Sequence, residues 1–279
     1  MRTLRLAPAL LIALPTLATF ATRTAAGATR TAAGQDVLPT PRQVVSRHLA
    51  ATGLSERPAA KKSRRAVGKI SIPERQLEGA FETVAARPDR YVQRTNIPGL
   101  GASSTGYDGD VGWQMQAMAG ANVLEGEALR QLQHRALFDV EAHPAELYES
   151  MEVLGKVSFA DRECLRLRLV RKAAGTESTA EGRALREIDE FYDVATGLKV
   201  GSRSTFAGPT GPREVTVVYD AYREFGGVRV PTRITQEMGG MQVVQEVETV
   251  EWNTVDEGAF EPPPEVRAIL KKRAGSGDV

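Results

Sequence analysis

The chain has 279 residues, of which 42% are hydrophobic and 25% charged, so it can bury a sizeable core as one large or two small domains. Its formal net charge is +1. Residues 1–34 hold four arginines and no acid, so 32 basic and 35 acidic side chains remain after them. This balance argues against a general nucleic-acid binder.

The first 34 residues predict an export signal followed by a spacer. Arg2 and Arg5 precede an apolar run from Leu6 to Phe20, which is short for a membrane span and typical of a secretory signal peptide. The repeat ATRTAAG then occurs twice, at 21–27 and 28–34, which is too few and too short for a solenoid. We therefore expect a cleaved signal and a soluble periplasmic protein without a lipid anchor.

Residues 40–53, TPRQVVSRHLAATG, predict a short helix. Thr40 is suited to cap it, Pro41 suits the first helical position, Gln43 completes a capping box and Gly53 ends it. A basic stretch follows, and its interpretation stays open between a solvated linker and a contact with anionic lipid headgroups. The residues proposed for headgroup contact are Lys61, Lys62, Arg64 and Arg65.

From residue 66 to 252 the pattern is mostly of period two, broken by turn residues every 8 to 14 positions. In LRLRL, for example, Leu165, Leu167 and Leu169 alternate with Arg166 and Arg168. About ten strands in meander order are expected. A sheet of that size seldom stays flat. The predicted fold class is mainly β with a few helices: a single antiparallel meander sheet curled into an open, unclosed barrel that helices cover.

A helix over 125–139 interrupts the strands, and a second short helix is expected near the C-terminus. The predicted organisation is a signal peptide and spacer (1–34), an N-terminal helix and basic linker (35–65), an open β-barrel domain (66–264) with a helical insertion at 125–148, and a C-terminal helix and tail (265–279).

The stretch STGYDGDVGWQMQ raises the question of a carboxylate site, because Asp108 and Asp110 lie one residue apart. Asp108-Gly109 is a preferred pair for a two-residue type I′ hairpin turn. A calcium loop would need a third oxygen ligand at position 112, which is Gly112. We interpret the motif as a turn.

Other candidates for chemistry are weak. His48, His134 and His143 form no metal-binding spacing, and no serine-hydrolase elbow occurs. Cys164 has no partner for an internal disulfide, lies far from the signal and is expected to be a small buried residue. We expect no enzymatic activity, no metal and no cofactor.

Four stretches together carry a resemblance: GYDGDVGW, FYDVATGLKVGSR, YDAYREFGGVRVPTRI and VETVEWNTVDEGAFEPP. In this order, with a helix before them and a helical insertion among them, the chain resembles the LolA/LolB-like group of exported bacterial proteins over about residues 38–264. The resemblance implies an unclosed barrel around an apolar cavity that holds acyl chains. It also implies acyl chains of lipoproteins or lipids as ligands, and transient membrane-associated donor and acceptor proteins as partners.

Because side chains alternate between the two faces of a strand, the apolar positions of each strand predict which residues line a cavity. Its candidate lining residues are Trp113, Met115, Leu167, Leu169, Val217, Tyr219, Val230 and Ile234. The helices at 41–52 and 125–138 are expected to cover its mouth through Val45, Leu49, Leu129 and Leu132. The predicted function is non-enzymatic carriage of acylated ligands between the membranes by a monomer. The alternatives are an envelope-stress sensor or a scaffold of the same fold that binds a protein, and a fully packed barrel without a ligand.

Overall fold

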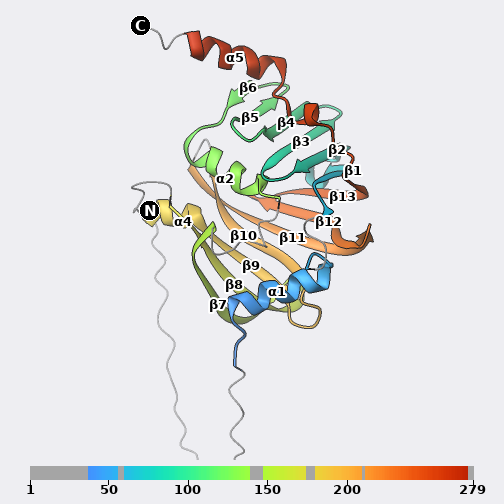
Figure 1. Cartoon of the computed structure of the whole chain (residues 1–279), viewed down its shortest axis with the longest axis vertical. Helices are drawn as coiled ribbons and strands as arrows, with labels where there is room; N and C mark the ends of the chain where they lie inside the picture. The colour runs from blue at the N-terminus through green and yellow to red at the C-terminus, as the bar shows by residue number, and fades with distance from the viewer. Residues whose placement is uncertain (1–36, 56–59, 139–146, 174–179, 209–210, 276–279) are drawn as a thin grey trace, which may run out of the picture. The chain divides into compact units, whose positions relative to one another are not determined.

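The structure is a computed structural model that describes residues 37–55, 60–138, 147–173, 180–208 and 211–275 (Figure 1). The predicted signal peptide, the tandem repeat and the last residues of the predicted tail lie outside these ranges. The chain divides into two compact units, Met1–Val37 and Leu38–Val279. Every helix and strand discussed below belongs to the second unit.

The described part of this unit contains one antiparallel sheet of thirteen strands. In chain order the strands are β1 Ser63–Ile72, β2 Leu77–Ala86, β3 Arg90–Ile97, β4 Gly101–Tyr107, β5 Gly112–Gln116, β6 Gly120–Val123, β7 Tyr148–Phe159, β8 Arg162–Arg171, β9 Glu187–Asp193, β10 Lys199–Gly208, β11 Gly211–Phe225, β12 Val228–Met238 and β13 Met241–Trp252. Their order in the sheet is β6-β5-β4-β3-β2-β1-β13-β12-β11-β10-β9-β8-β7. Consecutive strands therefore pair with each other, except β6 and β7, and β1 pairs with β13 at the centre.

The sheet does not close, because β6 and β7 form its two edges. This confirms the predicted open antiparallel meander, but the strand number is larger than the ten expected. Short strands such as the four-residue β6 hold too few positions for a period of two to stand out in the sequence.

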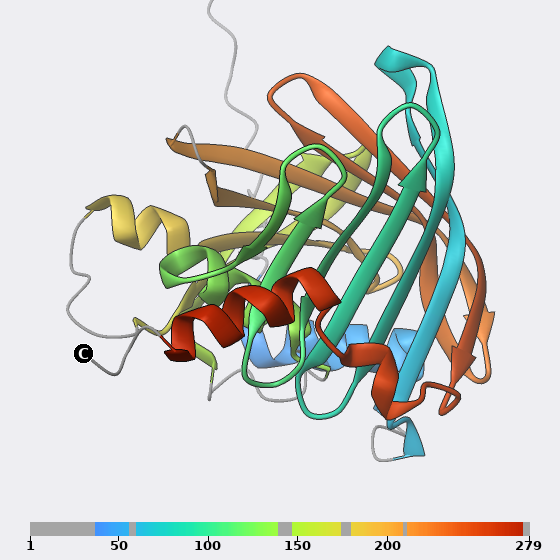
Figure 2. The same cartoon turned by 90° about the horizontal axis from the view of Figure 1, so that it is seen from above.

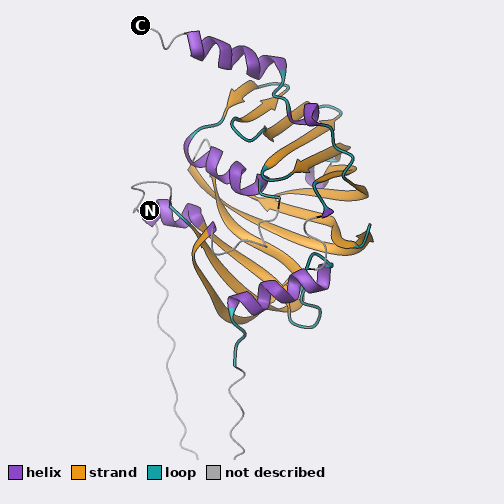
Figure 3. Ribbon diagram, viewed as in Figure 1, coloured by secondary structure: helices purple, strands orange, loops and turns teal. Residues whose placement is uncertain are grey.

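The helices are α1 Pro41–Thr52, α2 Gly126–Ala136, α4 Ala180–Arg186 and α5 Pro264–Gly275, with the 3-10 turns η2 Pro73–Arg75 and η4 Glu257–Phe260 (Figure 3). The predicted caps of α1 are confirmed. The Thr40 hydroxyl accepts a hydrogen bond from the Gln43 N–H, Gln43 completes the capping box, and Gly53 adopts a φ of 76°. The short helix α4 was not predicted.

Helices cover both faces of the sheet (Figure 2). We call the face that packs against α1 and α2 the inner face, and the face that packs against η4 and α5 the outer face. Neighbouring residues of β2 show the alternation: Ala85 packs in the cluster that contains Leu132 of α2, whereas Val84 packs in the cluster that contains Val266 of α5. Gln131 of α2 also donates to the carbonyl oxygen of Thr205 on β10, 3.1 Å away. The sheet therefore curls around α2.

Cross-strand ion pairs lie on the outer face beside the helices. Arg65 on β1 and Arg94 on β3 both contact the Glu82 carboxylate on β2, at 2.7 and 3.2 Å. Strand β1 begins at Ser63, inside the predicted basic linker, so Arg65 is a strand residue rather than part of a free segment.

Candidate ligand-binding face

Three leucines on the inner face of β8 lie under α1. Leu165, Leu167 and Leu169 are 7%, 0% and 2% exposed, and they form one cluster with Val44 and Val45 of the helix. Leu49 packs against the same cluster. The structure therefore brings Leu167 and Leu169 together with the helix residues Val45 and Leu49. In this structure α1 itself covers the leucines.

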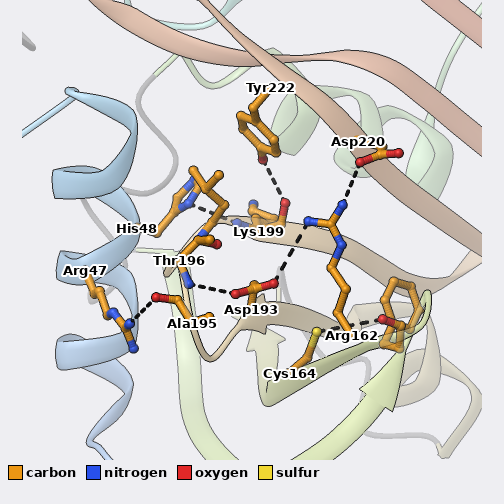
Figure 4. Close-up of polar contacts among 12 residues, drawn as sticks. Arg47, His48, Arg162, Cys164, Asp193, Ala195, Thr196, Lys199, Asp220 and Tyr222 are labelled. Carbon is orange, nitrogen blue, oxygen red and sulfur yellow. Dashed lines mark hydrogen bonds and ion pairs between the residues drawn. The ribbon is translucent and has the colours of Figure 1, made fainter.

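Polar bonds hold α1 on the turn between β9 and β10 (Figure 4). The Arg47 guanidinium donates to the carbonyl oxygen of Ala195 at 3.0 Å. The next residue, His48, is 5% exposed, and its Nδ1 accepts a hydrogen bond from the Lys199 N–H at 3.2 Å. The His48 ring also contacts the edge of the Tyr192 ring, with centroids 5.5 Å apart. The helix is thus attached through a few apolar and polar side chains of one face.

Asp193 stiffens the same turn from below. Its carboxylate accepts from the Thr196 N–H at 2.7 Å and lies 3.9 Å from Arg162, which in turn contacts Asp220 of β11 at 2.7 Å (Figure 4). Burial raises the pKa of Asp193, but hydrogen bonds from Thr196 and Ala195 and the nearby Arg162 outweigh it, so the pKa lies below its usual value. The turn that receives α1 is therefore held by contacts that do not involve the helix.

A buried ion pair lies within the apolar region of the inner face. Glu190 on β9 and Lys199 on β10 are 13% and 12% exposed at their side chains, and their charged atoms are 2.8 Å apart. The Tyr192 hydroxyl donates to the other Glu190 oxygen at 2.5 Å. Glu190 pairs across the strands with Leu167 and therefore lies on the same face. The pair was not predicted, because the pairing of Glu190 with Lys199 depends on how β9 and β10 align.

Helix α2 covers the other half of the inner face. Leu132 and Ala136 are buried against Ala85, Tyr91 and Tyr107, and Leu129 packs beside them. Gly112 permits this approach, since a Cβ at that position would lie 2.5 Å from Leu129 Cδ1 and 3.2 Å from Leu132 Cδ2. The predicted covering residues Leu129 and Leu132 do face the sheet. They cover the β2–β5 half, while Val45 and Leu49 cover β7–β9. Helix α2 also reaches the second region, since His134 Nε2 lies 3.0 Å from the Tyr148 hydroxyl on β7 and Glu127 contacts Arg171 of β8 at 2.9 Å.

The middle of the inner face is less covered than its two ends. Ile234 of β12 is partly buried and packs against a third cluster that includes Phe81 and Val247. Tyr219 pairs with Ile234 across β11 and β12, and Val217 lies two residues before Tyr219 on the same face. Val217, Tyr219 and Val230 are likewise partly exposed. These predicted residues lie on the inner face between the two helices.

The structure corrects the predicted positions of Trp113 and Met115. Trp113 is 0% exposed and packs with Phe260 and Val266 on the outer face. Its ring lies over Gly106, where a Cβ would come within 2.3 Å of it, and Met115 follows two residues later on the same side of β5. Parity grouped these residues correctly with each other, but the helix α5 makes the outer face of β5 apolar as well.

Part of the inner face is polar. Tyr91 and Tyr107 point toward α2, so residues at even spacing from them on β3 and β4 share that face. These residues include Gln93, Thr95, Ser103 and Thr105. The hydroxyl oxygens of Thr95 and Ser103 lie 2.6 Å apart, and Gln93 accepts from the Tyr91 hydroxyl at 3.0 Å. The inner face thus combines an apolar half under α1 with a more polar strip beyond α2.

The four basic residues proposed for headgroup contact do not form one patch. Lys61 donates to the Gly226 carbonyl oxygen at 2.9 Å and lies over the Trp252 ring. Lys62 is exposed, and Arg64 is partly buried in β1. Arg65 contacts Glu82 and Glu251 on the outer face. Because β1 begins at Ser63, its alternation turns Arg64 and Arg65 to opposite faces.

The Asp108 motif is a turn, though not the two-residue turn predicted. Tyr107 pairs with Gly112, so four residues connect the strands. One carboxylate oxygen of Asp108 accepts from the N–H groups of Asp110 and Val111, at 2.9 and 2.7 Å, and Gly109 adopts a φ of 112°. The Asp108 carboxylate is thereby used within the loop.

Within the described residues, no group of three or more His, Cys, Asp or Glu side chains is placed to hold a metal ion. Burial raises the pKa of the Cys164 thiol to about 11, which keeps it protonated and unreactive at neutral pH. Among the same residues, no helix is long and apolar enough to cross a membrane.

Comparisons with known proteins rest on the fold. No family model matches the sequence, and no curated protein matches it. Among solved structures, a LolA superfamily protein from Nitrosomonas europaea superposes with a TM-score of 0.50 at 14% identity, covering 81% of this chain and 99% of that one. This chain shares the fold of that protein.

Two further structures agree with this LolA-like fold. A domain from Vibrio parahaemolyticus described as an outer membrane lipoprotein-sorting protein has a TM-score of 0.50 at 11% identity, over 82% of this chain and 97% of its own. A DUF1329 family protein from Desulfovibrio piger has a TM-score of 0.52 at 12% identity, over 79% and 95%. At 11–14% identity, these similarities show a shared fold.

Proposed function

We propose that this chain is a non-enzymatic binding protein that carries acylated ligands, lipids or the acyl chains of lipoproteins, in the periplasm. The observation that supports this most directly is a row of three buried leucines on the inner face, Leu165, Leu167 and Leu169, which the short helix α1 covers. The LolA-like fold and its similarity to a domain described as lipoprotein-sorting agree with it.

The energies favour exchange between α1 and an acyl chain. Burial of Val44, Val45 and Leu49 against β8 stabilises the docked helix by about 2 kcal/mol for each side chain, or about 6 kcal/mol together. An acyl chain of about 15 methylenes, at about 0.8 kcal/mol each, gains about 12 kcal/mol when it leaves water. An acyl chain that takes the place of α1 gains more than these three side chains lose, and the lost contacts of Arg47 and His48 offset part of that gain. The difference is small enough for a partner to reverse.

The polar groups of the inner face suit an amphipathic ligand. The Glu190–Lys199 pair lies beside the middle of the leucine row, where Glu190 pairs with Leu167, and the strip with Gln93 and Thr105 lies beyond α2. Groups of this kind satisfy ester or amide oxygens that an apolar surface would leave unpaired. The chain acts in this proposal as a monomer, with transient membrane-associated donor and acceptor proteins.

Native mass spectrometry with lipid extraction tests the function. The exported protein should carry phospholipid or an acylated protein. Leu167→Glu and Leu129→Glu should lose this ligand while remaining folded. Leu154→Glu is the matched control, because Leu154 is 39% exposed on the edge strand β7. A protein that retains a stoichiometric protein partner but never lipid contradicts carriage and favours a sensor or scaffold.

A further inference from the structure

An open pocket of about 590 Å³ lies where four segments meet at one end of the sheet. Its walls come from the start of β1, the end of β2, the start of β3 and the segment that follows β13. Ser63 pairs with Ala86 across β1 and β2, and the Asn253 N–H donates to the Ser63 carbonyl oxygen at 2.9 Å. The pocket lies apart from the leucine row under α1.

The pocket is positively charged. Lys62, Arg87 and Arg90 line it, and Glu257 is the acidic residue among its lining residues. The lining therefore has a formal charge of +2. Ala86 and Val255 supply an apolar wall. Such a combination favours an anion that also has a less polar part.

The cationic groups are held in position by neighbouring aromatic and backbone groups. The Arg90 guanidinium lies 4.9 Å from the centre of the Phe260 ring, and that of Arg87 lies 5.3 Å from the centre of the Phe138 ring. Arg87 Nε also donates to the Lys61 carbonyl oxygen at 2.9 Å. Side chains that are ordered before binding lose less entropy when a ligand arrives.

Glu257 already binds the pocket as an anion would. Its two carboxylate oxygens accept from Nη1 and Nη2 of Arg90, at 2.5 and 3.1 Å. This two-pronged geometry is the one with which arginine binds carboxylate and phosphate groups. The Glu257 side chain is 86% exposed, so water can readily replace its contacts. Glu257 therefore occupies the Arg90 guanidinium in the absence of a ligand, and an incoming anion can displace it.

We propose that this pocket is a binding site for a phosphate-class anion, which Lys62, Arg87 and Arg90 hold once Glu257 has moved aside. The ligand is either the phosphate of an anionic lipid headgroup or free phosphate. The site does not depend on acyl binding at the inner face, so either proposal can fail alone.

Two measurements test the site and identify the source of the anion. Inorganic phosphate is titrated while the backbone signals of Lys62, Arg90 and Asn253 are followed by NMR. Separately, co-sedimentation compares vesicles of phosphatidylglycerol and phosphatidylcholine with vesicles of phosphatidylcholine alone. Saturable shifts in these signals with phosphate, without a preference for the anionic vesicles, identify free phosphate. A preference for the anionic vesicles identifies the headgroup.

Variants attribute the binding to the pocket. Lys62→Gln/Arg87→Gln should weaken it by about 25-fold, at about fivefold for each basic side chain. Arg75→Gln/Lys271→Gln removes the same charge elsewhere and should weaken it by at most about twofold. Glu257→Gln should strengthen binding more than Glu78→Gln, which removes one exposed acid from β2. Equal effects within either matched pair, or no binding of phosphate and no vesicle preference, would overturn the proposal.

Discussion

The Nδ1 atom of His48 on α1 accepts a hydrogen bond from the backbone N–H of Lys199 on β10, at 3.2 Å. The side chain of Lys199 forms the buried ion pair with Glu190, so one residue contacts the helix through its backbone and Glu190 through its ammonium group. The attachment of α1 is therefore coupled to the polar group beneath it.

The first prediction concerns this attachment. His48→Ala removes the acceptor of the Lys199 N–H and the ring contact with Tyr192, and should cost about 1–2 kcal/mol. Amide hydrogen exchange of α1 should rise while that of β8 stays slow. Arg42→Ala, at an exposed position of the same helix, serves as the control. Unchanged exchange in α1 would show that His48 does not hold the helix.

The second prediction concerns the buried ion pair. Glu190→Gln leaves the Lys199 ammonium buried with a weakened partner, so the free energy of unfolding should fall by about 3 kcal/mol. Removal of both charges in Glu190→Gln/Lys199→Met should restore part of the loss. Urea unfolding of the two single variants and the double variant measures this coupling. Additive losses would mean that the two groups do not interact.

The third prediction concerns acid stability. Burial raises the pKa of Asp189, but hydrogen bonds from Arg168 and Arg166 outweigh it and hold the pKa below its usual value. A lowered folded pKa means that the unfolded state binds the proton more readily, so this stabilisation is present above about pH 4 and is lost as the pH falls through the folded value. Asp189→Asn should therefore cost about 3 kcal/mol at pH 7.

This cost should shrink as the pH falls below about 4, because the unfolded state of the unsubstituted protein then binds a proton at Asp189 while the folded state still resists it. Chemical unfolding of both proteins between pH 7 and pH 3 provides the comparison. A difference in unfolding free energy that stays constant over this range would contradict the assigned cause.

The fourth prediction separates the two faces of β5. A methyl group in Gly106→Ala would meet the buried Trp113 ring, so stability should fall by about 1–3 kcal/mol. The ligand content should not change, because Trp113 packs against Phe260 on the outer face. Native mass spectrometry of the folded variant checks this. A loss of ligand in this variant would indicate that Trp113 contacts the ligand, and would contradict its placement on the outer face.

The sequence predicted local structure well where the chemistry is local. The capping box of Thr40 and Gln43 and the end of the helix at Gly53 depend on residues within one turn. The period of two located most strands, and turn residues located their ends. The prediction of a two-residue turn at Asp108 was wrong, because a carboxylate that accepts hydrogen bonds from two N–H groups stabilises a four-residue loop as well as a shorter one.

Facing and pairing were harder to predict. Alternation tells that Trp113 and Met115 share a side, but it does not tell which side is inner when α5 covers the outer one. The partnership of Glu190 with Lys199 depends on the register of β9 and β10, which has an irregularity between Lys199 and Gly201. The basic pocket joins Arg90 and Glu257, which are far apart in the chain, and no local pattern records that contact.

The most direct measurement of the central claim is photo-crosslinking with a fatty-acyl probe that carries a diazirine near its methyl end, followed by peptide mass spectrometry. We predict labels on the inner face, at Leu165, Leu167 and Leu169 of β8 and at Val44 or Val45 of the displaced helix. An excess of unlabelled fatty acid should remove them. Labels confined to the outer face around Trp113 and Phe260, or no labelling that competes, would contradict acyl binding on the inner face.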